Sequence, residues 1–312
     1  MNDHRAHVLT SLRCNNHCVF CMEGDHLAAS DPSGLAPFMS EGKLRRQLLQ
    51  IKDRDLPVLF TGGEPTLNPR LPQLIGLARR LGFERIGLQT NGRRILYPDY
   101  LRRLVDAGLS DMTISIHGSV GRIHDAMTRL PGSLAQTLSG LAETLRCKIL
   151  VPRLRLATTT TICRINLKDM EGLLKLLLGR SGIDAIVLNP LILSGNAARY
   201  RGQLTASYAA MVRHFRASLD RLGREGARGF DRITWTDMPP CVMPGLEDYV
   251  GTFERVTVFP PETGRMEVLP EKLIFPGIKR ARCRSCSRRR ACTGINPAYI
   301  RSFGWSEFVP CR

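Results

Sequence analysis

The sequence predicts an α/β fold built from parallel strands that alternate with amphipathic helices. Six short runs rich in Val, Ile, Leu and Thr have the composition of strands, and they often end in Gly, Asn or Pro. They cover residues 7–12, 58–61, 85–90, 112–117, 154–162 and 184–190. A segment with helical apolar periodicity follows each run, so the chain contains six βα units in succession. Six such units imply a parallel sheet with right-handed crossovers, either open or curled into a partial barrel.

The helical segments are recognised by apolar residues that recur on one face. In the first, Leu44, Leu48 and Ile51 are spaced by four and three residues, and Ser40 is placed to cap the helix. Ser133 is expected to cap the fourth helix in the same way. The other faces fall within residues 71–78, 101–105, 134–145, 170–177 and 208–222. Ligands of parallel α/β sheets bind at the carboxyl ends of the strands, so we expect the functional residues there.

The regular alternation ends near residue 225, which divides the chain into two expected domains. Residues 1–225 form the βα domain, and residues 226–312 form a smaller loop-rich and cysteine-rich domain. The chain carries 45 Lys and Arg against 28 Asp and Glu, a net charge of +17. This surplus favours acidic partners such as an electron carrier, a peptide or nucleic acid, unless it is only a solvated arginine-rich surface. No apolar run is long enough to cross a membrane and no secretory signal is visible, so we expect a cytoplasmic protein.

Ten cysteines are many for a chain expected in a reducing compartment, where clustered thiols more often bind metal than form disulfides. Cys14, Cys18 and Cys21 form a CxxxCxxC loop directly after the first predicted strand. Three thiolates from one loop can hold three irons of a 4Fe–4S cluster and leave the fourth iron open to a ligand. The alternative is zinc, which needs a fourth ligand, and His17 offers one only from within the same short loop.

The spacing of this loop resembles the signature of the radical SAM superfamily, which uses S-adenosylmethionine (SAM). The resemblance implies that Phe20, before the last cysteine, lies against the adenine of SAM. Gly62, Gly63 and Glu64 follow the second strand and resemble the family's GGE motif, which receives the methionine amino group. Glycines let the backbone approach a ligand closely, and a carboxylate pairs with an ammonium group. The alternative for this segment is an ordinary turn before a helix.

Further segments at strand ends resemble the family in the same order along the chain. Asn91 ends the third strand in a TNG sequence, and Ser115 ends the fourth in a sequence that commonly contacts SAM. Arg129 occupies a position at which an arginine of the family can reach the SAM carboxylate. Asn166 and Asn189 are weaker candidates near the ribose. The alternative interpretations are that Asn91 is an ordinary turn residue, that Ser115 caps a helix and that Arg129 is a surface arginine. Together these motifs imply the family's partial (βα)6 barrel.

A second cysteine group lies near the end of the chain. Cys283, Cys286 and Cys292 form CxxCxxxxxC, which resembles the core of the SPASM or twitch extension behind some radical SAM barrels. The fourth cysteine of the full SPASM run is absent, so the resemblance implies one auxiliary 4Fe–4S cluster rather than two. Cys241 is assigned as its fourth ligand, with Cys311 as the alternative. A structural zinc knuckle is the competing interpretation.

The resemblance implies an enzyme that reductively cleaves SAM to a 5′-deoxyadenosyl radical and abstracts hydrogen from a peptide or natural-product intermediate. Seven cations between residues 279 and 290 predict docking of an acidic electron donor such as flavodoxin or ferredoxin. No N-terminal extension precedes the first strand, so peptide recognition is expected to use a partner protein or the basic surface. The alternatives are a nucleotide or RNA substrate, and a non-catalytic zinc- or nucleic-acid-binding protein. An aromatic content of 6% and the lack of a known RNA-binding module argue against nucleic acid.

Overall fold

The computed structural model describes residues 5–22, 24, 38–251, 256–258, 267–269, 277–290, 292 and 294–311. Within these residues one curved sheet contains nine strands in the order β7-β6-β5-β4-β3-β2-β1-β8-β9. Neighbouring strands from β7 to β8 run parallel, and only β9 is antiparallel to its neighbour. The strands are β1 (Arg5–Leu9), β2 (Val58–Thr61), β3 (Ile86–Thr90), β4 (Asp111–Ser115), β5 (Arg155–Ile162), β6 (Ala185–Pro190), β7 (Ile233–Trp235), β8 (Val256–Val258) and β9 (Glu267–Leu269).

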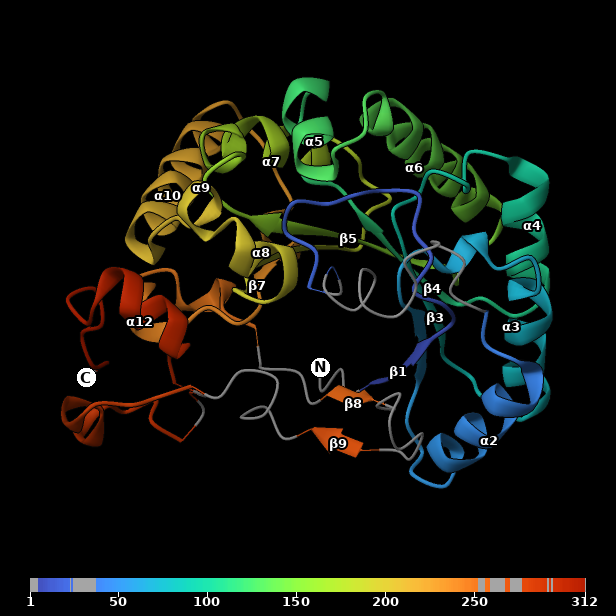
Figure 1. Cartoon of the computed structure of the whole chain (residues 1–312). Coiled ribbons are helices and arrows are strands. Elements are labelled where there is room, and N and C mark those ends of the chain that lie inside the picture. Colours follow the sequence, from blue (N-terminus) through green and yellow to red (C-terminus); the bar gives the residue numbers. More distant parts are fainter. Residues whose placement is uncertain are drawn as a thin grey trace.

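The helices are α2 (Glu41–Lys52), α3 (Leu71–Arg80), α4 (Pro98–Asp106), α5 (Gly121–Thr128), α6 (Ser133–Leu150), α7 (Met170–Leu178), α8 (Gly195–Arg199), α9 (Arg201–Leu204), α10 (Tyr208–Arg224) and α12 (Pro297–Phe303). Helices α2, α3, α4, α6, α7 and α10 lie outside the curved sheet and follow its strands around an arc (Figure 1). The sheet does not close on itself among the described residues, since β7 and β9 form its two edges. The architecture is therefore α/β and open-barrel-like, which confirms the predicted fold class.

The core lies between the helices and the convex face of the sheet. Val8, Phe60, Leu88 and Ile114 come from four neighbouring strands and are all fully buried. The predicted helices turn their apolar faces to the sheet, as α2 does with Leu44, Leu48 and Ile51. On α6 two of the predicted leucines, Leu138 and Leu145, are only half-buried. Burying side chains of this size contributes roughly 1.5–3 kcal/mol each, so the regular apolar spacing holds the helices on the sheet.

The amino ends of the strands are held by charge. Asp111, at the start of β4, forms salt bridges with Arg85 at 3.0 Å, Arg5 at 3.7 Å and Arg155 at 3.9 Å. These arginines stand at the starts of β1, β3 and β5 or one residue before them. This group of salt bridges therefore lies at the opposite end of the sheet from the candidate functional residues. It stabilises the fold and takes no part in the site.

One predicted helix cap is confirmed and the other is wrong. Ser40 caps α2, and its hydroxyl accepts a hydrogen bond from the Lys43 backbone N–H at 3.3 Å. Ser133 is instead the first residue of α6, which follows Gly132 in the left-handed conformation. The carboxylate of Asp125 accepts from the N–H groups at the start of α6, including that of residue 134 at 2.9 Å. A carboxylate is a stronger acceptor than a hydroxyl, so Asp125 takes the capping role.

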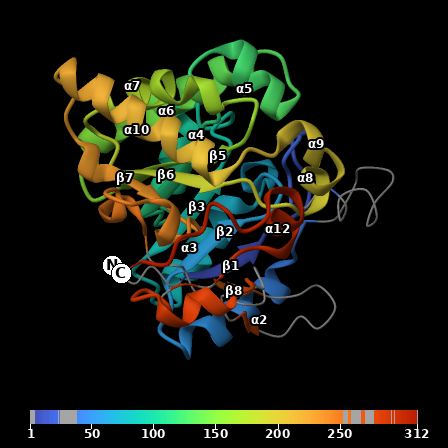
Figure 2. The ribbon, with the colours of Figure 1, turned by 90° about the vertical axis from the view of Figure 1, so that its left-hand side faces the viewer.

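The sheet continues past the predicted domain boundary at residue 225. Strand β7 pairs with β6, and β8 pairs with β1 on the far side of the sheet. The C-terminal helix α12 also docks on the barrel, because Tyr299 stacks on Tyr208 with ring centroids 4.1 Å apart. Figure 2 views the molecule from the side on which α12 lies. The division into residues 1–225 and 226–312 stays a prediction. No helix among the described residues is long and apolar enough to span a membrane.

Candidate functional site

The cysteine loop after β1 is held first by the carboxyl end of α5. The backbone N–H of His17 donates to the carbonyl of Thr128 at 2.9 Å, and the N–H of Val19 donates to that of Met127 at 3.0 Å. Both carbonyls lie at the end of α5, where the last turn of a helix leaves acceptors without helical partners. The middle of the loop is thereby fixed against the rest of the barrel.

The second anchor of the loop is the start of α8. Asn196 donates from its side-chain amide to the carbonyl of Cys18 at 3.0 Å and from its backbone N–H to that of Cys21 at 2.9 Å. Gly195 allows this approach, since a Cβ there would lie 2.5 Å from the Cys21 carbonyl oxygen and its φ is +52°. Asn196 was not predicted from the sequence, and its position just after the sixth strand is the only signal that points to it.

The third anchor comes from the end of β3. The side-chain amide of Asn91 donates to the side-chain oxygen of Asn15 at 2.7 Å. The guanidinium of Arg93 donates to the carbonyl of Asn15 and, at 3.0 Å, to the side-chain oxygen of Asn16. Asn91 thus contacts the cysteine loop, while its predicted role in binding SAM stays a prediction. Arg93 is a second residue that sequence reasoning missed, two positions after Asn91.

The three thiols of the loop lie within electrostatic range of one another. Burial raises the pKa of the Cys14 thiol to about 12 and raises that of Cys18 further, and the neighbouring thiols add to both shifts. Thiols of this kind stay neutral until a cation binds and takes the place of their protons. The donor set therefore fits an iron–sulfur cluster, which gives each thiolate its own iron. No three His, Cys, Asp or Glu side chains in the described part of the chain converge closely enough to hold a single metal ion.

The Gly-Gly-Glu segment packs directly on the start of this loop. The N–H of Gly63 donates to the carbonyl of Ser11 at 2.8 Å, and the N–H of Glu64 donates to that of Arg13 at 2.7 Å. A Cβ on Gly63 would lie 2.3 Å from the Arg13 carbonyl oxygen, and one on Gly62 would lie 2.3 Å from that of Ser11. Only glycine fits at both positions, so the segment is more than an ordinary turn.

The Glu64 carboxylate is buried and accepts four hydrogen bonds from protein. One oxygen accepts from the Thr66 backbone at 3.0 Å, the Thr66 hydroxyl at 2.5 Å and the Thr90 hydroxyl at 2.7 Å. The other accepts from the Asn91 N–H at 2.7 Å. Burial raises the pKa of Glu64, and these bonds partly offset the rise. Glu64 thus joins the ends of β2 and β3, while its predicted contact with the SAM ammonium stays a prediction.

Phe20 lies against a pair of buried histidines beside the cysteine loop. Its ring packs edge-on to that of His117, with centroids 4.6 Å apart. The backbone N–H of His117 donates to the Nδ1 of His124 at 3.0 Å, and that of Thr161 donates to the Nδ1 of His117 at 3.3 Å. Burial lowers the pKa of both imidazoles, so both are neutral at pH 7. Ser115 lies half-buried at the end of β4, two residues before His117.

The remaining candidates bond to protein groups. The guanidinium of Arg129 lies 4.6 Å from the ring centroid of Tyr200, and its reach to a SAM carboxylate stays a prediction. The side-chain amide of Asn166 donates to the carbonyl of His117 at 2.9 Å. Asn189 bonds to threonines of β5 and of the segment after β7. The ribose contacts suggested for the two asparagines also stay predictions.

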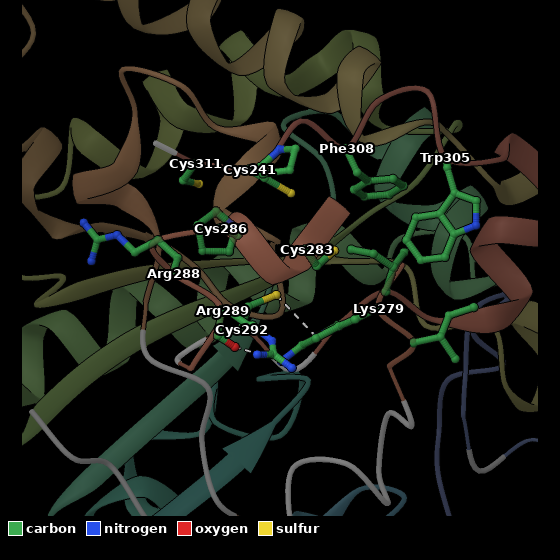
Figure 3. A pocket seen from close by; sticks show the side chains of 15 residues that line it. Cys241, Lys279, Cys283, Cys286, Arg288, Arg289, Cys292, Trp305, Phe308 and Cys311 are labelled. Atoms are coloured by element: carbon green, nitrogen blue, oxygen red, sulfur yellow. Dashed lines mark hydrogen bonds between the residues drawn. The ribbon is translucent and has the colours of Figure 1, made fainter. Parts of the chain in front are cut away.

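The five cysteines of the C-terminal part line one pocket (Figure 3). Cys241 comes from the segment after β7, Cys283, Cys286 and Cys292 come from the CxxCxxxxxC run, and Cys311 comes from the end of the chain. The pocket measures about 470 Å³ up to and including its mouth. The assigned fourth ligand and its alternative therefore reach the same place, and the structure does not separate them.

This pocket combines half-buried cysteines with basic side chains. Burial raises the pKa of Cys241 to about 12, and the thiols of Cys292 and Cys311 add to the shift. Lys279 lies close enough to Cys292 to lower the pKa of that thiol against the effect of burial. Arg288 and Arg289 line the pocket, and the same segment carries three further exposed arginines, Arg282, Arg284 and Arg290. A four-thiolate cluster is anionic, so nearby cations would stabilise it.

Comparison with known protein families finds one matching family model. It is described as the radical SAM superfamily and matches residues 8–177. Curated relatives include a 7,8-dihydro-6-hydroxymethylpterin dimethyltransferase of Methanocaldococcus jannaschii, with 34% identity over 36% of this chain and 22% of that protein. An AdoMet-dependent heme synthase of Methanosarcina barkeri is 29% identical over 50% of this chain and 42% of the relative. A probable GTP 3′,8-cyclase of Metallosphaera sedula is 33% identical over 42% of this chain and 39% of the relative. The chain thus matches less than half the length of each relative.

Solved structures agree with this assignment at the level of the fold. HydG, a maturase of the FeFe hydrogenase, has a TM-score of 0.57 at 12% identity, covering 97% of this chain and 69% of its own. The methylornithine synthase PylB has a TM-score of 0.52 at 12% identity, and the match covers 100% of this chain and 84% of PylB. With the CxxxCxxC loop, the parallel sheet and the match over residues 8–177, the chain belongs to the radical SAM superfamily, whose members use a 4Fe–4S cluster and SAM.

Proposed function

We propose that Cys14, Cys18 and Cys21 hold the SAM-binding 4Fe–4S cluster and that the protein abstracts hydrogen from a substrate. The observation that carries this proposal is the anchoring of the cysteine loop from three sides, by α5, α8 and the end of β3. A loop held so firmly keeps its thiols in place without metal, which lowers the cost of assembling the cluster. When bound, the cluster and SAM supply one-electron reductive cleavage chemistry.

The chain's own residues prepare the surroundings of this reaction. Gly62 and Gly63 bring the backbone within bonding distance of the cysteine loop, which leaves no room for a side chain between them. Phe20 and the neutral His117 form an uncharged surface beside it, suited to a nucleobase. Glu64 holds the ends of β2 and β3 together. These residues bind, orient and exclude water, which is the part a protein plays in cofactor chemistry.

For the substrate, the first candidate is a peptide or a small natural-product intermediate, because the C-terminal cysteines resemble a SPASM or twitch extension. The second candidate is a nucleotide-type compound, and the relatives favour it, since two of them are named for GTP and for a pterin. Both candidates share one requirement: a hydrogen atom moves from the substrate to the 5′-deoxyadenosyl radical, which becomes 5′-deoxyadenosine and leaves a substrate radical.

An isotope experiment tests this function and separates the two substrate classes. Metabolites from cells grown in heavy water are divided into peptide and nucleotide fractions and incubated anaerobically with the protein, a reductant and unlabelled SAM. The true substrate class should deliver deuterium to 5′-deoxyadenosine, measured by mass spectrometry. Deuterium from the nucleotide fraction alone would remove the peptide hypothesis, and the reverse result would remove the second. Cleavage of SAM without label from any fraction would contradict hydrogen abstraction.

We further propose that the five-cysteine pocket holds one auxiliary 4Fe–4S cluster, ligated by Cys283, Cys286, Cys292 and either Cys241 or Cys311. The presence of these five cysteines, from three separate segments, in the lining of one pocket supports this proposal. A structural zinc would need only four of them, so metal analysis is required to separate the two.

The auxiliary cluster predicts a defined iron count. The wild type should contain about eight irons per chain, and the Cys283→Ala, Cys286→Ala double variant about four, because a cluster of this kind loses its ligands with these thiols. The double variant should still cleave SAM, since Cys14, Cys18 and Cys21 are untouched. A wild type with about four irons and one zinc would contradict the auxiliary cluster. Comparing Cys241→Ala with Cys311→Ala identifies the fourth ligand, which is the one whose loss depletes iron.

The electron donor is proposed to be acidic, as flavodoxins and ferredoxins are. The five exposed arginines between residues 282 and 290 form no salt bridge within the described part of the chain. Of the five, only Arg288 lies close enough to a carboxylate of the described residues, that of Glu247, to lower its pKa, so most of this positive charge is available to a partner. Exposed charges of one sign speed association with an opposite partner, and salt screens the effect. Reduction by flavodoxin should therefore slow as salt is raised, while reduction by a small neutral reductant should not. Equal salt dependence for both reductants would reject this docking surface.

A further inference from the structure

Arg93 places a permanent positive charge against the cysteine loop. Its guanidinium donates to the carbonyl of Asn15 and to the side chain of Asn16, which lie between the first two cysteines. Its Nε donates to the side-chain oxygen of Gln136 on α6 at 2.6 Å. The backbone N–H of Asn16 in turn lies 3.4 Å from the sulfur of Cys14. Arg93 therefore acts on the segment that carries Cys14 both by contact and by charge.

The charge of Arg93 is not neutralised by an ion pair. No carboxylate forms a salt bridge with it within the described residues, and the partner of its Nε is the neutral amide of Gln136. The half-buried position of the Arg93 side chain keeps solvent from screening the charge fully.

We propose that Arg93 is a positioning residue that raises the reduction potential of the cluster held by Cys14, Cys18 and Cys21. The inference rests on the function proposed above. Reduction adds one negative charge to an already anionic cluster, so a fixed cation nearby stabilises the reduced state more than the oxidised state. The two hydrogen bonds from its guanidinium to Asn15 and Asn16 hold this cation in one position beside the loop. Arg93 thereby makes the electron transfer that precedes SAM cleavage more favourable.

The sharpest test leaves Arg93 in place and neutralises its charge. Gln136→Glu puts a carboxylate at the Nε of Arg93 while the contacts to Asn15 and Asn16 remain. A redox titration is run with each variant in the Cys283→Ala, Cys286→Ala background, which removes the proposed auxiliary cluster. The electron paramagnetic resonance signal then reports only the cluster held by Cys14, Cys18 and Cys21, and its midpoint potential should shift to a lower value. Arg93→Gln should shift it further in the same direction, whereas Arg93→Lys should stay near the wild type because it keeps the charge. Arg102→Gln, on the exposed face of α4, removes the same charge from a remote position and should cause no shift.

The outcomes separate this inference from the proposed function. Unchanged potentials in both Gln136→Glu and Arg93→Gln would overturn the inference. An equal fall in Arg93→Lys and Arg93→Gln would also overturn it, because Arg93 would then act by contact and not by charge. If the Arg93 variants fail to take up iron, Gln136→Glu still decides the question. The absence of any four-iron signal in the Cys283→Ala, Cys286→Ala background, with Arg93 and Gln136 unchanged, would refute the proposed function instead.

Discussion

Replacing Gly63 with alanine should abolish SAM cleavage, with a loss of at least about 100-fold. The added Cβ would lie 2.3 Å from the carbonyl oxygen of Arg13 and 2.5 Å from that of Leu12. Both atoms belong to the backbone between β1 and Cys14, so they cannot move aside as a flexible side chain would. The cysteine loop or the Gly-Gly-Glu segment must shift instead. A shift of about 1 Å in a catalytic geometry is enough for a loss of this size.

The control for this variant is Gly202→Ala on α9. A Cβ there meets no atom within 4 Å, so the substitution should leave both iron content and SAM cleavage at wild-type levels. Release of 5′-deoxyadenosine is measured for both variants under the same anaerobic conditions. Full activity in Gly63→Ala would show that the close approach of the two segments is not needed for the reaction.

Glu64→Gln should lower two quantities, the free energy of unfolding and the affinity for SAM. The Glu64 carboxylate accepts four hydrogen bonds, and a glutamine must turn its NH2 group toward one of these donors. Losing a hydrogen bond to a buried charged group and leaving its donor unpaired costs about 1.5–3 kcal/mol. The free energy of unfolding, measured in urea, should fall by about this amount. If Glu64 also meets the SAM ammonium, SAM affinity should fall roughly tenfold to a hundredfold.

The two effects of Glu64→Gln are measured separately. SAM affinity is determined at a temperature where the variant remains folded, and iron content serves as the check that the cluster is present. Glu84→Gln, in an exposed turn before β3, is the control and should change neither quantity. Reduced stability with unchanged SAM affinity would confine Glu64 to its structural role between β2 and β3.

The sequence predicted the fold well because strand and helix patterns are local. All six expected strands and six expected helices appear, with most boundaries within two residues. Ser133 failed as a cap because its competitor, Asp125, lies eight positions away and is invisible to a local capping rule. The strands β7, β8 and β9 were not predicted, since segments of three residues are too short to show a period.

Only those residues of the candidate site that belong to a sequence motif were predicted. CxxxCxxC and Gly-Gly-Glu carry their own signal, but the contacts of Glu64 with Thr90 and Asn91 span 26 and 27 residues. Arg93 and Asn196 have no motif, and their importance comes from hydrogen bonds to a loop distant in sequence. Spacing could likewise not choose between two fourth ligands that the fold brings to the same pocket.

The most direct test of the central claim is reductive SAM cleavage by reconstituted protein. Wild type and the Cys14→Ala, Cys18→Ala, Cys21→Ala triple variant are each incubated anaerobically with dithionite and SAM, and 5′-deoxyadenosine is quantified by chromatography. The wild type should release 5′-deoxyadenosine, whereas the triple variant should release none above the protein-free background. The variant should keep about four irons in the five-cysteine pocket, which would show that it is folded. Equal release by both proteins would contradict the assignment of these three cysteines.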